Sequence, residues 1–273
     1  MTDSAGPPGP IDVCIAGASG GVGQQLIAEV LKRPDEFRLV SAVTRKTAGQ
    51  DIGSVVVGRP CGVIATDSID AALDAKPAVL IDYTHPAAVH GNIDAAFARG
   101  IHVVIGTTGF FDHDFERIDA AARSAGVGAI TGNFSLTAAL MLHFSKIAAR
   151  YVPHWEVIEY AGARKPDVPS GTAREVVEEL ARVRSPHVHL RDDQLIGPVA
   201  ARGASVGGAH VHSVRLPGCP LAVEVIFGAE GERLILRHDE QDNTIFVEGT
   251  LIAAREVRSI KGLVRGLDTL LIK

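Results

Sequence analysis

The sequence has few cysteines, no excess of basic residues and no long apolar segment, and each absence excludes a class of protein. Its three cysteines, Cys14, Cys61 and Cys219, form no CxxC pair, which argues for reduced thiols rather than a disulfide framework or a zinc site. A formal net charge of −5 argues against a nucleic-acid-binding surface, which is normally basic. No stretch approaches the ~18 apolar residues of a membrane-spanning helix. We therefore expect neither a nucleic-acid partner nor a membrane partner.

The N-terminal residues do not form a recognisable signal peptide, and the histidines do not form a recognisable metal-binding motif. Residues 1–10, MTDSAGPPGP, are polar, rich in proline and glycine and free of basic residues, which is typical of a loose tail rather than a signal peptide. The sequence has no HExxH motif, no Cys/His motif and no calcium-binding loop. We interpret His143, His154, His210 and His212 as structural residues. A cytoplasmic protein without a metal site is the expectation.

Short apolar segments alternate with helical patterns through the first half of the chain. Each is rich in Val, Ile or Ala and ends at Gly, Thr or Asp; they are 11–16, 38–43, 78–82, 101–105 and 127–131. Continuous apolar strands that alternate with helices predict a parallel sheet covered on both faces. Right-handed crossovers then give a Rossmann-like, doubly wound α/β fold.

The pattern changes after Asn133. Longer segments of alternating polarity follow a helical stretch, at 154–160, 209–216, 221–227 and 233–238. The last two are joined by a glycine-rich hairpin signal, so we predict a second α+β domain with an antiparallel or mixed sheet. Residues 247–273 return to a helical pattern. We expect a first domain at 1–134, completed by 247–273, and a second domain at 135–246.

A glycine-rich segment follows the first predicted strand and opens the first predicted helix. It reads Gly17, Ala18, Ser19, Gly20, Gly21 and Val22, followed by Gly23. Glycines let the backbone turn tightly and approach a pyrophosphate, whose charge is met by the N–H groups at a helix start. The GxxGxxG spacing alone is moderately specific, but the strand–loop–helix context favours a dinucleotide site.

Two other interpretations of this segment are open. The residues also fit GxSxG, the nucleophile elbow of α/β hydrolases, but that fold needs earlier strands and none is predicted before Ile11. The segment can also be a purely structural turn. The dinucleotide interpretation is favoured because the first strand and the first helix flank the glycines directly.

The end of the second strand selects the cofactor in a dinucleotide domain. An acid there binds the ribose 2′-OH of NAD, whereas a cation accommodates the 2′-phosphate of NADP. Thr44 stands where the acid is expected, and Arg45 and Lys46 follow. These residues favour NADPH, with NADH as the alternative cofactor. The other interpretation of the segment is a solvated loop with ordinary basic residues.

A second motif precedes a helical segment in the second domain. Thr172 and Glu175 form a T-x-x-E capping box, and the N–H groups of Gly171 and Thr172 predict an anion site suited to a substrate carboxylate. Lys165 lies nearby, and a lysine partly desolvated beside a second cation, here Arg164, can donate a proton near neutral pH. The alternative is a well-capped helix after a proline-rich loop.

Together these motifs resemble the 4-hydroxy-tetrahydrodipicolinate reductase family, formerly called dihydrodipicolinate reductase, of the lysine pathway. The likeness extends over nearly the whole chain and is carried by GASGGVG at 17–23, DYTHP at 82–86, IGTTGF at 105–110, GNFS at 132–135, KPDVPSGT at 165–172 and VHSVRL at 211–216. It implies an NAD(P)H-dependent reductase of a small cyclic imine or unsaturated carboxylic acid. It also implies a homotetramer built through the sheets of the second domain.

The resemblance further implies the role of individual residues. The pyrophosphate would lie on Gly17 to Val22, and the adenine ribose at Thr44 and Arg45. The residues implied around the nicotinamide are Gly106, Thr107, Thr108, Thr131, Gly132, Asn133 and Phe134. Those implied at the substrate are Ser170, Gly171 and Thr172 for its carboxylate, Arg164 nearby and Lys165 as the catalytic acid.

Three positions depart from the family pattern. The pattern Glu-x-His-His-x-x-Lys has Ala161 and Gly162 in place of both histidines, and Asn243 stands where many members carry an arginine near the substrate site. Each lost charge-assisted hydrogen bond weakens binding by roughly 1.5–3 kcal/mol. Three hypotheses stay open: a divergent lysine-pathway reductase, a paralogue that reduces another imine, and a catalytically weak NADP-binding protein.

Overall fold

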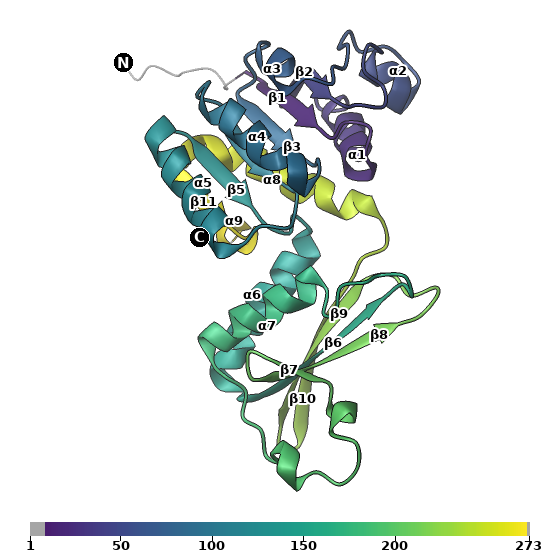
Figure 1. Ribbon diagram of the computed structural model, residues 1–273, viewed down its shortest axis with the longest axis vertical. Helices are drawn as coiled ribbons and strands as arrows, with labels where there is room; N and C mark the ends of the chain where they lie inside the picture. The colour runs from purple at the N-terminus through teal and green to yellow at the C-terminus, as the bar shows by residue number, and fades with distance from the viewer. Residues whose placement is uncertain (1–8, 272–273) are drawn as a thin grey trace. The chain divides into compact units, whose positions relative to one another are not determined.

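The computed structural model describes residues 9–271, so residues 1–8 of the expected tail lie outside the described residues. The chain divides into two compact units, one extending to Leu136 and resuming at Asn243, the other Thr137–Asp242. Figure 1 follows the chain through both units by colour. Within residues 9–271, no helix is long and apolar enough to cross a membrane.

The first unit contains a six-stranded sheet in which every pairing is parallel, in the order β11-β5-β4-β3-β1-β2 (Figure 1). The first five strands in chain order are β1 (Ile11–Ala16), β2 (Phe37–Val43), β3 (Val79–Asp82), β4 (His102–Ile105) and β5 (Gly128–Thr131). Neighbouring residues of a strand point to opposite faces, yet Leu80 and Ile81 of β3 are both fully buried. Both faces are therefore covered, which confirms the predicted Rossmann-like sheet.

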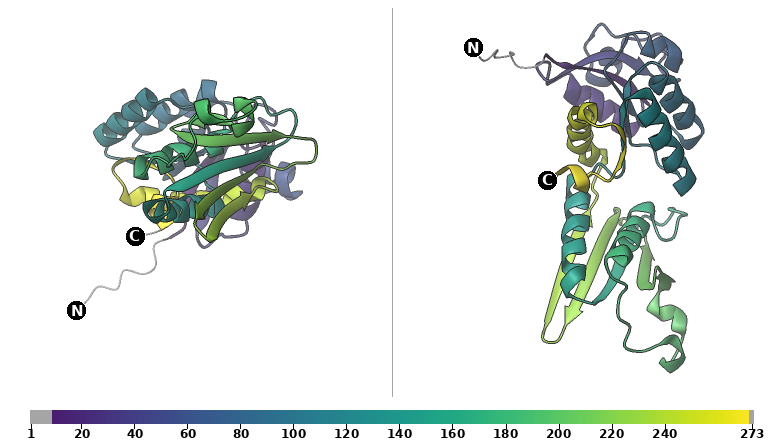
Figure 2. Two further views of the ribbon diagram at one scale, coloured as in Figure 1. Left: turned by 90° about the horizontal axis from the view of Figure 1, so that it is seen from below. Right: turned by 90° about the vertical axis from the view of Figure 1, so that its left-hand side faces the viewer.

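Helices form one layer on each face of this sheet. On one face α4 (Pro86–Phe97) packs against α3 (Ile69–Leu73) and α5 (Asp112–Ala125). On the other face α1 (Gly21–Val30) packs against α8 (Val247–Glu256). The right-hand view of Figure 2 shows blue α4 and α5 on one side of the strands and purple α1 with yellow α8 on the other. The short helices are α2 (Ile52–Val57) and α9 (Asp268–Leu271).

The C-terminal segment contains a strand that the sequence does not predict. A helical pattern is expected throughout 247–273, but β11 (Gly262–Arg265) pairs in parallel with β5. Four residues are too few to show the two-residue period of a strand. Pairing with β5 supplies the backbone partners of β11, so the strand arises from tertiary contact rather than from local sequence.

The second unit contains a five-stranded mixed sheet packed on two helices (Figure 1). Its order is β10-β9-β6-β8-β7, with β6 and β8 parallel and the other pairs antiparallel. The strands are β6 (His154–Ala161), β7 (Ala204–Val206), β8 (Ala209–Arg215), β9 (Ala222–Ala229) and β10 (Glu232–Asp239), and the helices are α6 (Leu136–Tyr151) and α7 (Gly171–Val183). Alternate residues of β6 are buried in the core formed with both helices. The predicted α+β domain with a mixed sheet is confirmed.

Candidate active site

The glycine-rich loop joins β1 to α1 where the strand order of the first sheet reverses, between β1 and β3. Gly17 has a φ of +84°, and a Cβ there would collide with the carbonyl oxygen of Tyr83, directly after β3. A Cβ on Gly23 would collide with the carbonyl oxygen of Gly17. Glycine is therefore required at both positions. Ligands of doubly wound sheets bind at this reversal, beyond the carboxyl ends of the strands.

The start of α1 presents backbone N–H groups to solvent. Its N-cap residue, Gly20, makes no side-chain cap, and both Gly20 and Gly21 are exposed. Ser19 and Val22 are half-buried, whereas Ala18 is buried and donates its N–H to the last carbonyl of β2 at 3.0 Å. The first N–H groups of a helix have no intrahelical acceptor. An exposed helix start without a side-chain cap fits the pyrophosphate of a dinucleotide.

Thr44 follows β2 and connects that strand to the glycine-rich loop. Its side chain is buried, and its Oγ1 lies 2.5 Å from Oγ of Ser19 and accepts the N–H of Lys46 at 3.3 Å. Arg45 and Lys46 are both exposed. The structure thus sets two cations beside the loop and gives Thr44 hydrogen-bond partners within the protein.

Asn243 lies against the glycine-rich loop of the first unit. A Cβ on Gly21 would collide with the side-chain amide nitrogen of Asn243. The resemblance places Asn243 near the substrate site. Its neighbour in the structure is Gly21 of the glycine-rich loop, because the chain re-enters the first unit at Asn243.

A buried aspartate, not identified as functional from the sequence, orders the loops after β3 and β4. Asp82 ends β3 with no exposed area, and its carboxylate accepts from Thr84 N at 3.0 Å, Thr84 Oγ1 at 2.7 Å, Asn92 Nδ2 at 2.7 Å and Thr107 Oγ1 at 2.8 Å. A buried carboxylate needs such donors to offset its desolvation. In the sequence, Asp82 could have been identified as a charged residue at the end of an apolar strand.

The segment after β4 rests on the ring of Tyr83. A Cβ on Gly106 would collide with that ring, so the backbone of Gly106 lies directly against it. The Tyr83 hydroxyl lies 2.6 Å from Oγ1 of Thr250, and burial raises the pKa of the Tyr83 phenol despite this hydrogen bond. Tyr83 is therefore a neutral support for the loop. Thr107 is buried beside Asp82, and Thr108 is exposed.

The segment after β5 lies next to the segment after β4, because the two strands are neighbours. Thr131 is buried and donates to the last carbonyl of β4 at 3.3 Å. Gly132 has a φ of +150°, which favours glycine. Asn133 is half-buried and accepts a backbone N–H two residues on, at 2.9 Å. Phe134 is buried, with its ring centroid 6.5 Å from that of Tyr83. The residues expected at the cofactor thus gather at one edge of the first sheet.

In the second unit, the predicted anion site is the start of α7, but the predicted cap is wrong. The N-cap is Ser170, whose Oγ accepts the N–H of Ala173 at 3.3 Å, and the helix begins at Gly171. Thr172 is therefore the second helical residue and cannot form a capping box with Glu175. Ser170 is also a good N-cap residue, and its tertiary partner fixes the helix start two residues earlier than predicted. Gly171 is exposed and Thr172 half-buried.

The tertiary partner of Ser170 is Glu159, which has no exposed area. Its two carboxylate oxygens accept the backbone N–H of Ser170 at 3.0 and 2.9 Å, and Oε1 also accepts from Ser213 Oγ and Arg215 Nη2, both at 2.6 Å. Burial alone would favour the neutral acid, but hydrogen bonds from Ser170, Ser213 and Arg215 lower the pKa of Glu159. Glu159 is thus a buried carboxylate that holds the start of α7 in place.

Lys165 is half-buried and lies beside an acidic side chain. Its Nζ is 3.0 Å from Oδ1 of Asp167, while Arg164 is exposed. The expected influence of the Arg164 charge on Lys165 stays a prediction. Burial raises the pKa of Glu240, and the Lys165 charge opposes that shift. Asp167 is therefore the acidic side chain in ion-pair contact with Lys165.

The two positions that lack the family histidines differ in the space around them. Ala161 ends β6 and is 1% exposed. Gly162 begins the turn after β6, and its carbonyl oxygen accepts the N–H of Lys165 at 3.0 Å. A Cβ on Gly162 would have one neighbour within 4 Å, the carbonyl oxygen of Cys219 at 3.9 Å. There is consequently room for a side chain at Gly162 and little at Ala161.

No metal motif is visible in the sequence, but the described part of the chain brings three histidines together: His154, His187 and His189. They lie at the end of β6 opposite to Ala161. His212, which we also interpret as structural from the sequence, has its Nε2 atom 2.8 Å from Oε2 of Glu156.

Comparison with known proteins places both units in one family. Residues 11–134 match the N-terminal part of dihydrodipicolinate reductase, and residues 137–271 match its C-terminal part. The 4-hydroxy-tetrahydrodipicolinate reductase of Moorella thermoacetica is 40% identical over 264 residues, which cover 96% of this chain and 98% of that protein. That of Geobacillus thermodenitrificans is 37% identical, with coverage of 96% and 99%.

Solved structures give the same result. The dipicolinate-bound dihydrodipicolinate reductase from Paenisporosarcina sp. TG-14 superposes with a TM-score of 0.82 at 33% identity, covering 95% of this chain and 99% of that one. An amine dehydrogenase from Mycobacterium smegmatis has a TM-score of 0.62 at 15% identity, which shows a shared fold alone.

Proposed function

The chain belongs to the dihydrodipicolinate reductase family of NAD(P)H-dependent oxidoreductases, and we propose that it reduces 4-hydroxy-tetrahydrodipicolinate in lysine and diaminopimelate biosynthesis. One observation carries the proposal: the start of α7 is anchored by buried Glu159, with Lys165 on the same connection between β6 and α7. These residues support a carboxylate-binding turn and an acid like those that the resemblance implies, despite the lost histidines.

The first unit supplies the cofactor site in this proposal. The start of α1 would hold the pyrophosphate, and Arg45 with Lys46 would neutralise a 2′-phosphate, so we propose NADPH as the preferred cofactor. The nicotinamide, which supplies the hydride when the cofactor is bound, would lie by residues 106–108 and 131–134. A hydrogen bond to Asp82 fixes the position of Thr107, and the backbone of Gly106 packs against the ring of Tyr83.

The second unit supplies substrate binding and the proton. The N–H groups of Gly171 and Thr172, with the Ser170 cap, would bind one substrate carboxylate, and Arg164 would contribute charge near its far side. Lys165 would donate the proton that accompanies reduction, which is the role of a general acid. Asp167, 3.0 Å from the Lys165 ammonium, would orient it and help return a proton after turnover.

We propose a homotetramer assembled through the second sheet, in the cytoplasm. Leu234 and Ile235 of the edge strand β10 are 44% and 41% exposed, one on each face of the sheet. Exposed apolar side chains on a sheet are typical of an interface between subunits.

A second candidate is supported by the space at Gly162. A pocket without the family histidines has fewer donors and more room, which suits a cyclic imine with one carboxylate and a bulkier or less charged far side. The test is NADPH oxidation with freshly generated 4-hydroxy-tetrahydrodipicolinate beside a panel of cyclic imines. The proposal predicts turnover of the first compound at roughly 1–1000 per second. Higher kcat/KM on another imine would favour the second candidate.

A further inference from the structure

The group formed by His154, His187 and His189 has no part in the proposed reduction. His154 is the first residue of β6, and the turn that carries Lys165 follows the last residue of the same strand. At ~3.3 Å per residue, the two ends of β6 are about 23 Å apart. His187 and His189 lie on the connection between α7 and β7, residues 184–203, which contains only two short 3₁₀ turns as regular structure.

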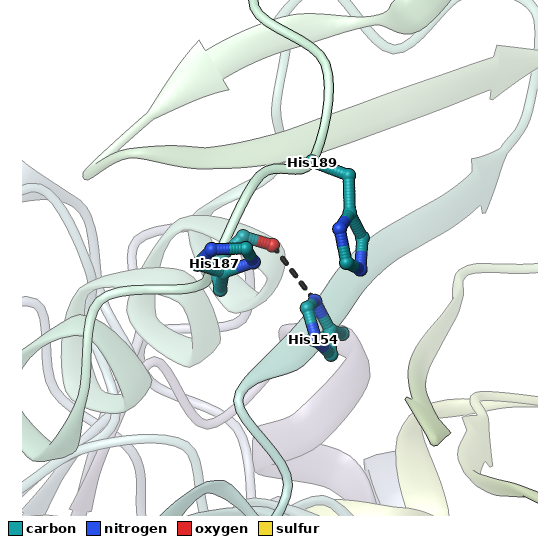
Figure 3. A group of neighbouring side chains, drawn as sticks. All are labelled: His154, His187 and His189. Atoms are coloured by element: carbon teal, nitrogen blue, oxygen red, sulfur yellow. Dashed lines mark hydrogen bonds between the residues drawn. The ribbon is translucent and has the colours of Figure 1, made fainter. Parts of the chain in front are cut away.

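The three imidazoles are close enough to share one ion. One ring nitrogen of each lies within 4.8 Å of the other two, and the ring centroids are separated by 4.9, 4.5 and 5.0 Å. Figure 3 shows His154 at the strand start and the other two rings on the passing connection. Nitrogens bound to a tetrahedral ion at about 2.0–2.1 Å are ~3.3 Å apart. Small rotations of the two exposed side chains, His187 and His189, would close the difference.

Two hydrogen bonds hold the connection at the strand start. The backbone N–H of His187 donates to the carbonyl of Pro153 at 2.7 Å, and Nδ1 of His154 donates to the carbonyl of His187 at 3.0 Å. The second bond places the ring proton of His154 on Nδ1 and leaves the lone pair of Nε2 available. Metal-binding histidines are typically oriented by such a bond from the other ring nitrogen to a backbone carbonyl.

We propose that His154, His187 and His189 bind one divalent transition-metal ion, which ties residues 184–203 to the start of β6. Three neutral imidazoles suit Zn²⁺, Cu²⁺, Ni²⁺ or Co²⁺, whereas Mg²⁺ and Ca²⁺ prefer oxygen ligands. A three-histidine set leaves further positions for water, so the ion exchanges with solvent more freely than in a closed four-ligand site.

The probe is Zn²⁺ alone, titrated calorimetrically into the full-length chain after tag removal and treatment with a chelator. His189→Ala is the informative variant, because the His189 side chain makes no hydrogen bond to the described residues and its loss should not impair folding. His143→Ala is the matched control, since His143 lies on α6 outside the cluster. Co²⁺ absorption in the visible range reports the ligand set independently of activity.

Wild-type protein and His143→Ala should each bind one Zn²⁺ per chain, and His189→Ala should bind it about tenfold or more weakly. At one Zn²⁺ concentration, the ion should raise the Tm of the first two proteins more than that of His189→Ala. Absence of binding by wild-type protein, or equal binding by all three proteins, would overturn the proposal. Equal binding would mean an adventitious ion only, with the rings merely stacked on one another.

Discussion

Glu159 accepts the backbone N–H of Ser170 on both of its carboxylate oxygens, so a side chain without exposed area fixes the start of α7. Glu159 also accepts from Arg215, whose Nη2 donates to the carbonyl of Asp167 at 2.7 Å. One carboxylate therefore connects the turn proposed for the substrate with the segment that carries Lys165. Glu159 is a positioning residue, since it acts through these groups.

Glu159→Gln should raise the KM for the substrate about tenfold while changing kcat less. The amide retains the shape, but it cannot accept all the hydrogen bonds that the carboxylate accepts, and the unfolding free energy should fall by about 1.5–3 kcal/mol. Glu178→Gln, on the exposed side of α7, is the control. Steady-state kinetics and denaturant unfolding measure both effects, and an unchanged KM would argue against the positioning role.

The stability of the fold should depend on pH through the same carboxylate. Hydrogen bonds lower the pKa of Glu159 in the folded chain below its unfolded value of about 4.3. Its contribution is therefore complete above that value and is lost as the pH falls through the folded pKa. Wild-type protein should lose unfolding free energy more steeply in this acidic range than Glu159→Gln does. Parallel profiles for the two proteins would contradict the assignment.

Lys165→Ala and Arg164→Ala should affect different kinetic constants. Loss of the acid should lower kcat by ~10²-fold or more, whereas loss of the exposed Arg164 charge should mainly raise KM. Binding of NADPH should be unchanged in both variants, because each residue belongs to the second unit. Turnover by Lys165→Ala close to the wild-type value would mean that the proton comes from another donor.

Arg45→Ala should weaken NADPH binding about tenfold and leave NADH binding nearly unchanged, because its guanidinium is proposed to contact the 2′-phosphate, which NADH lacks. Arg59→Ala, another exposed arginine of the first unit, serves as the control. Calorimetric titration at one fixed salt concentration compares the cofactors, since surface charges are screened by salt. Tighter binding of NADH than of NADPH by wild-type protein would refute the preference.

Gly162→His and Ala161→His should behave differently although both restore a family residue. The space at Gly162 accepts a side chain, and one charge-assisted hydrogen bond should raise kcat/KM on 4-hydroxy-tetrahydrodipicolinate by roughly tenfold to a hundredfold. Ala161 is buried, so a larger side chain should cost about 1–3 kcal/mol of stability. If Gly162→His does not raise kcat/KM, other groups already replace that histidine.

The sequence predicts the first sheet well because each of its first five strands is rich in apolar residues and most of their side chains are buried. It does not predict β11, whose four residues become a strand through pairing with β5. The predicted cap at Thr172 fails because Glu159, eleven residues before Ser170, decides where α7 begins. Neither the contact between Asn243 and Gly21 nor the histidine cluster could be predicted from the sequence, since both bring together residues far apart in the chain.

The most direct test of the proposed activity follows the hydride itself. NADPH carrying deuterium on the transferred side of C4 is mixed with freshly generated 4-hydroxy-tetrahydrodipicolinate and wild-type protein, and the product is examined by mass spectrometry. We expect one deuterium per product molecule, formed at roughly 1–1000 turnovers per second, with the Lys165→Ala variant far slower. A product without label, or no product above the rate without protein, would contradict this expectation.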